Sequence, residues 1–230
     1  MEFRKPPYVV LVSIVTFVLL CGIAQAGSLG LVKQYPDITA SPVTSVSYKA
    51  SSQSFTINES GLGMVLDLDG ASPQEYWVGY DSSWNVDGKY TLNATIDHSG
   101  NFVSGSFEIY GSLVDLSFNP VQPYDLALSG KLTRFGYSAP NSNHGGVFEF
   151  LFEVTGGYLH TPSLFHSNSG GIIISGNSGT YSDFAHDFGL NSSTVDTFVP
   201  TPAALPWGLG MLVGMGCWAW LRARGRTSML

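Results

Sequence analysis

Hydrophobic and polar residues alternate along most of the chain, and this pattern predicts β-strands. Residues 45–49, 54–58 and 89–97 carry an apolar side chain at every second position, which gives each strand one apolar and one polar face. Residues 97–100 (Asp-His-Ser-Gly) separate the third of these runs from residues 104–110 and predict a β-hairpin. Further strands are predicted, about ten residues apart, at 125–128, 130–135, 146–154 and 171–175.

The spacing of these runs predicts an all-β fold. No stretch before residue 200 shows the apolar stripe of an amphipathic helix, and no repeat of fixed period indicates a propeller or a β-helix. We therefore expect one antiparallel β-sandwich or jelly-roll-like domain over residues 27–190. Residues 27–42 are expected to form an irregular lead-in to the domain. The polar residues 191–198 are expected to form an exposed linker behind it.

The first 26 residues have the three parts of a secretory signal peptide. Two basic residues precede the apolar run 8–20, and the small residues Ala24 and Ala26 follow it. A signal peptidase is expected to cleave between Ala26 and Gly27, which removes an N-terminal signal helix. The alternative is a permanent N-terminal membrane helix.

A second apolar segment, residues 203–221, predicts a membrane-spanning helix near the C-terminus. It has no charged residue, and its 19 residues would extend about 28 Å as a helix, close to the thickness of a hydrocarbon core. Three basic residues follow the segment and are expected to stop transfer and remain in the cytoplasm: Arg222, Arg224 and Arg226.

A short proline motif stands between the domain and this span. It consists of Val199, Pro200, Thr201 and Pro202, and its two prolines hold the chain extended, as proteases and transpeptidases require. Residues 199–226 resemble the PEP-CTERM sorting signal in its Val-Pro-x-Pro-Ala-Ala subtype, which exosortases of Gram-negative bacteria recognise. Thr201 stands where the commonest form of the motif has glutamate. Residues 128–136, 148–157 and 196–198 are also similar to segments of many PEP-CTERM surface proteins of unassigned function.

The resemblance implies how the protein is delivered. Signal peptidase and an exosortase would be its processing partners, and the membrane would hold it through a single C-terminal span before processing. The protein would then pass to the outer surface or extracellular matrix of a Gram-negative bacterium, where exopolysaccharide would be a partner. The alternative for the C-terminal segment is a plain single-pass anchor.

Charge and cysteine content narrow the function further. Residues 27–199 contain five basic and sixteen acidic residues, a difference of −11, which argues against binding to nucleic acid or anionic lipid. Both cysteines, Cys21 and Cys217, lie outside this stretch, so no disulfide can stabilise it. A domain of this length can bury about two-thirds of its unfolded surface without one.

Four aromatic residues are candidates for sugar binding. Flat rings beside polar acceptors can stack on sugar faces, although large aromatic residues also form the core of a sandwich. The candidates are Tyr76, Trp77, Tyr80 and Trp84.

Candidate catalytic or metal-binding residues do not form a complete pattern. Asp67 and Asp69 could begin a Ca²⁺ site but lack the spacing of an EF-hand loop. Glu149 and Glu153 would lie about 13 Å apart on one strand face, too far for a glycosidase pair. The remaining candidates lack the spacing of a zinc site: His160, His166, Asp183, His186 and Asp187. We therefore expect a non-enzymatic protein without a cofactor that is structural or adhesive, with a carbohydrate-binding module and a secreted hydrolase as alternatives.

Overall fold

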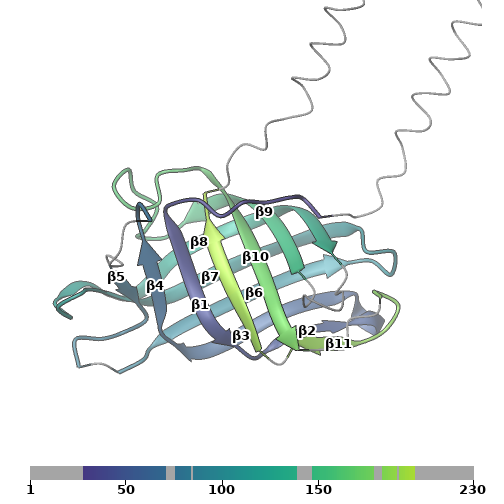
Figure 1. Cartoon of the computed structure of the whole chain (residues 1–230), viewed down its shortest axis with the longest axis horizontal. Coiled ribbons are helices and arrows are strands. Elements are labelled where there is room, and N and C mark those ends of the chain that lie inside the picture. The colour runs from purple at the N-terminus through teal and green to yellow at the C-terminus, as the bar shows by residue number, and fades with distance from the viewer. Residues whose placement is uncertain are drawn as a thin grey trace, which may run out of the picture.

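The computed structural model describes residues 28–70, 76–83, 85–138, 147–178, 183–190 and 192–199. These residues form an antiparallel all-β domain with one short 3₁₀ turn, Ala50–Ser52 (Figure 1). The predicted signal helix and the predicted C-terminal span lie outside the described residues. The described strands are β1 (Asp37–Val43), β2 (Val46–Lys49), β3 (Ser54–Leu62), β4 (Met64–Asp67), β5 (Tyr76–Val78), β6 (Gly88–Ile96), β7 (Phe102–Asp115), β8 (Pro120–Ser138), β9 (Val147–Gly156), β10 (Ser169–Ser178), β11 (Phe188–Leu190) and β12 (Ser192–Phe198).

Eight of the strands close into a barrel. The hydrogen-bonded order is β7-β8-β9-β10-β12-β1-β4-β5, and β5 pairs with β7 again to complete the ring. The other four strands continue from β7 in the order β6-β3-β2-β11. In Figure 1, β1 and β10 cross in front of β3 and β6, so the molecule also has two facing layers.

Strand β7 is the branch point between the barrel and the additional strands. Its first part pairs with β6, and its last three residues pair with β5. Three glycines allow the backbones to approach at this change of partner: Gly79, Gly88 and Gly111. The N–H of Gly79 donates to the carbonyl of Ser112 at 2.8 Å, which ties the corner between β5 and β6 onto β7.

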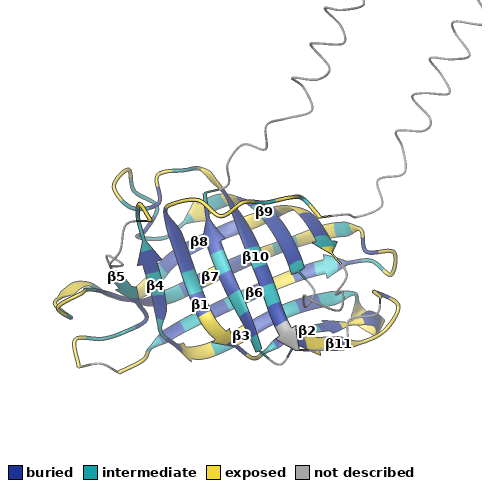
Figure 2. Ribbon diagram, in the orientation of Figure 1, coloured by how far each residue is buried: buried dark blue, intermediate teal, exposed yellow. Residues whose placement is uncertain are grey.

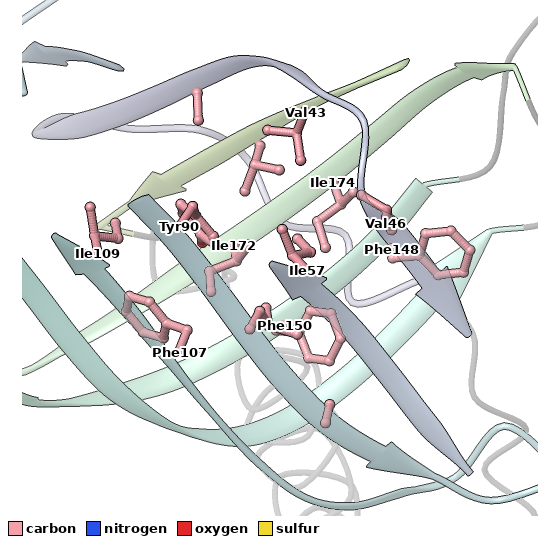
Figure 3. Close-up of a cluster of buried hydrophobic side chains, with 14 of the residues drawn as sticks. Val43, Val46, Ile57, Tyr90, Phe107, Ile109, Phe148, Phe150, Ile172 and Ile174 are labelled. Carbon is pink, nitrogen blue, oxygen red and sulfur yellow. The ribbon is translucent and has the colours of Figure 1, made fainter. Parts of the chain in front are cut away.

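Apolar side chains from both layers fill the interior. Phe107, Phe150 and Ile172 come from β7, β9 and β10 and lie in one buried cluster (Figure 3). The hydroxyls of Tyr90 and Thr197 lie 2.9 Å apart and link β6 to β12 across this core. Figure 2 shows buried residues throughout the strands of both layers, with exposed residues mostly in loops and at strand ends. Packing of this kind needs no disulfide.

The prediction of an all-β antiparallel fold is confirmed, but the sheets do not stay separate as in a simple sandwich. Strands β7 and β8 contain 14 and 19 residues, long enough to run from one layer into the other. Their shared register shifts at three places, and such bulges bend strands at barrel corners. The predicted strands 125–128 and 130–135 are therefore parts of one long strand.

Two boundary predictions were wrong. Residues 191–198 were expected to form an exposed linker, but β12 occupies 192–198 and lies between β1 and β10. Val195 and Thr197 on this strand are fully buried. Residues 27–42 were expected to be irregular, but β1 begins at Asp37. Both strands carry polar residues on the face away from the core, which weakens their apolar pattern.

Candidate functional site

Residues 28–36, called here the N-terminal strap, run along one edge of the barrel to the start of β1 (Figure 1). The strap is mostly exposed, and its first half, residues 28–31, is bound by Glu149 on β9. Phe148 and Phe150 point into the core, so Glu149 points outward, yet it is only 4% exposed. Its carboxylate accepts hydrogen bonds from the hydroxyl of Ser28 at 2.7 Å and from the N–H groups of Leu29, Gly30 and Leu31 at 2.5, 3.2 and 3.0 Å.

A second group of charges holds the other half of the strap. The ammonium of Lys33 lies 2.5 Å from the carboxylate of Asp37 on β1 and 3.2 Å from that of Asp196 on β12. The hydroxyl oxygen of Thr39 lies 2.8 Å from each carboxylate and donates its one proton to either of them. Asp37 is almost fully buried, and one of its oxygens has no hydrogen-bond partner. Burial raises the pKa of Asp37 to about 6, although the ion pair with Lys33 opposes this rise.

This raised pKa predicts a pH dependence of stability. The folded state holds the proton of Asp37 more tightly than the unfolded chain does, so this contribution is present at low pH and is lost as pH rises through about 6. Acidification from about pH 7.5 to about pH 5 should therefore raise the free energy of unfolding by about 1.4 kcal/mol through this group. Chemical denaturation at both pH values measures it. Asp37→Asn should lose this part of the pH dependence, and an unchanged dependence in that variant would contradict the assignment to Asp37.

The end of β12 lies beside the end of the strap. The N–H of Val199 donates to the carbonyl of Pro36 at 3.3 Å, and Phe198 before it is fully buried. Val199 is the first residue of the predicted sorting motif, so the motif follows the barrel without a spacer. The rest of the motif lies outside the described part of the chain: Pro200, Thr201 and Pro202. The same holds for the predicted signal-peptidase site (Ala24, Ala26 and Gly27) and for the stop-transfer residues (Arg222, Arg224 and Arg226).

The predicted sugar-binding aromatics lie at the loop end near β5. Trp77 and Phe118 have nearly parallel rings with centroids 6.3 Å apart, and Trp77 and Tyr80 form an edge-to-face pair with centroids 5.5 Å apart. The ring of Tyr80 lies against the backbone of Gly63, where a Cβ atom would not fit. Tyr76 is half-buried and packs against the core. Trp84 lies outside the described residues. The described rings thus pack largely against each other and the barrel.

Three loops of the chain share a motif, Asp-x-Ser-x-Asn, that the sequence analysis missed. It occurs at residues 81–85, 97–101 and 115–119. In each copy one aspartate oxygen accepts N–H groups two and four residues later, and the other accepts the asparagine side-chain amide. The hydrogen bond from the asparagine side chain is the main cause of the lowered pKa of all three aspartates. The three occurrences of the same five-residue pattern were the signal that could have revealed these turns.

Asp67 and Asp69, the candidates for a Ca²⁺ site, lie at a turn. One oxygen of Asp67 accepts the N–H groups of Asp69 and Gly70 at 3.3 and 2.8 Å, which stabilises the turn after β4. Among the described residues, no group of three or more His, Cys, Asp or Glu side chains is arranged to hold a metal ion.

The other candidate catalytic residues have separate partners. His160 lies 3.1 Å from the side-chain oxygen of Asn168, and His186 lies 2.8 Å from Asp183. Asp187 accepts hydrogen bonds from Lys49 at 3.0 Å and from the N–H of Ala50 at 2.8 Å. Glu149 binds the strap, whereas Glu153 and His166 are exposed on the surface. The hydrogen bonds of these side chains thus join each bonded one to a different structural partner, and the exposed Glu153 and His166 take no part in these contacts.

Comparison with known proteins adds no family. No protein-family model, curated protein or solved structure matches this chain. Within the described ranges, no helix has the length and apolar character needed to cross a membrane, and the predicted span at 203–221 is not among them.

Proposed function

We propose that this chain is an exported, non-enzymatic surface protein that an exosortase sorts to the cell surface or into an exopolysaccharide-containing matrix. Its role there is structural or adhesive. The observation that carries the proposal is the order of elements at residues 199–226, where a Val-Pro-x-Pro motif, an uncharged span and a basic cluster follow one another. The signal-peptide pattern at residues 1–26 supports the same route of export.

The geometry at the barrel edge is compatible with this route. The body of the protein runs from the strap, just after the predicted signal-peptidase site, to Phe198, just before the sorting motif. The strap and the end of β12 lie at one edge of the barrel in Figure 1, and the Val199–Pro36 hydrogen bond joins them. The described residues that follow the predicted signal-peptidase site and those that precede the sorting motif therefore lie at the same edge.

The alternatives receive less support from the side-chain contacts. A hydrolase needs converging catalytic groups, and Glu149 is occupied by four hydrogen bonds from the strap. A sugar platform needs exposed rings, whereas the described candidate rings are partly buried and Trp77 packs against Tyr80 and Phe118.

Mass analysis of the mature C-terminus tests the proposal. In cells with exosortase activity, the protein should end near the motif and lack Arg222–Leu230, and in cells without it this tail should remain. In exosortase-positive cells, changing Pro200 and Pro202 to alanine should also leave the tail in place. Pro206→Ala, which changes a proline beyond the motif, should still allow the tail to be removed. An intact tail on the mature wild-type protein in exosortase-positive cells would show that sorting by cleavage is wrong.

A further inference from the structure

The N-terminal strap lies across β12, the last strand of the barrel. Its attachment points are on both sides of that strand: Glu149 is on β9, and Asp37 is on β1. Strand β12 lies between β10 and β1 in the sheet, so the strap spans it from one flank to the other.

Two polar contacts join the strap to the end of β12, and Leu31 of the strap lies beside the same region. The Lys33 ammonium binds Asp196 at 3.2 Å, and the Pro36 carbonyl accepts the Val199 N–H. Leu31 and the ring of Phe198 both lie over Gly171 of β10, where an added Cβ atom would come within 3.1 Å of Leu31 and 3.2 Å of Phe198.

The burial of Phe198 shows that the strap covers the strand. Val195 and Thr197 point inward, so alternation directs Asp196 and Phe198 to the outer face. An aromatic ring on the outer face of a barrel would normally be exposed, yet Phe198 has no exposed surface. Cover by the strap explains this.

We propose that the N-terminal strap is a lock that holds β12 in the barrel. Strand β12 carries the C-terminal segment, so any pull on that segment acts first on this strand. Peeling β12 away would break the strap contacts along with the ladders to β1 and β10. The beginning of the described chain thus secures its last strand, and this role does not depend on how the C-terminal segment is processed.

Hydrogen exchange of the full-length chain in detergent micelles tests the lock. Glu149→Gln removes the carboxylate charge that four donors share, and we expect the backbone amides of β12 to exchange at least about tenfold faster as the strand opens locally. Amides of the β6–β7 hairpin should keep their wild-type rates. Leu31→Ala, which removes an uncharged contact and should leave folding intact, is expected to speed exchange in β12 in the same selective way.

A matched control lies on the same strand face. Glu153→Gln changes an exposed glutamate four residues along β9 and should leave the exchange of β12 unchanged. The proposal fails if β12 exchanges at the wild-type rate in both Glu149→Gln and Leu31→Ala. It also fails if β12 and the β6–β7 hairpin accelerate by the same factor, since this would indicate general destabilisation.

Discussion

Val195→Asp is expected to prevent the barrel from folding. Val195 has no exposed surface and lies on β12 opposite Ala40 of β1 and Ile174 of β10, both of them buried. A carboxylate at this point would be buried without a donor, which costs several kcal/mol. Because domains have only about 5–15 kcal/mol of stability, most of it would be lost. Far-ultraviolet circular dichroism and thermal unfolding of the purified chain measure the effect.

The adjacent residue provides the control for this experiment. Thr194 points to the outer face and is half-exposed, so Thr194→Asp should keep the fold and change the stability by no more than about 1 kcal/mol. If both variants folded equally well, residues 192–198 would behave as an exposed linker and the barrel topology would be wrong.

Gly79→Ala should have the second large effect. Gly79 has a φ of 81°, which disfavours a side chain, and an added Cβ atom would lie against the carbonyl of Leu62 and 2.5 Å from the Cα of Gly88. Both obstacles are backbone atoms, and Leu62 and Gly88 are partners in the β3–β6 ladder, so they cannot move without disturbing the pairing of β3 with β6. We expect a loss of at least about 3 kcal/mol, measured as a shift of the denaturation midpoint.

Gly61→Ala separates the two causes of that loss. Gly61 also has a positive φ, 72°, but nothing lies within 4 Å of the position of its missing Cβ atom. This variant should lose only the conformational part, about 1–2 kcal/mol. Equal losses at the two positions would show that close backbone approach is not what requires glycine at Gly79.

Sequence reasoning succeeded where the signal is local. The runs at 45–49, 54–58 and 89–97 alternate cleanly because one face of each meets the core, and they correspond to β2, β3 and β6. The turn at 97–100 also connects two strands as expected, β6 and β7.

It failed where burial comes from distant parts of the chain. Ser192–Phe198 reads as a linker because most of its residues are serine, threonine or aspartate, and its end at Asp196 and Phe198 is covered by a strap about 160 residues earlier in the chain. The sequence placed Glu149 and Glu153 too far apart for a glycosidase pair and indicated no other partner for Glu149, whose donors come from residues 28–31, more than one hundred positions away. No local pattern could indicate either contact.

The amino-acid sequence by itself determined the all-β class, the positions of most strands along the chain, and an acidic body without cysteine between two apolar ends. Each of these depends on neighbouring residues or on composition. Only the tertiary structure decided that the strands close into a barrel, that β12 lies between β10 and β1, and that Glu149 and Lys33 hold the strap. The physical reason is that strand pairing and burial depend on which residues meet across the sheet, and these meetings join positions far apart along the chain.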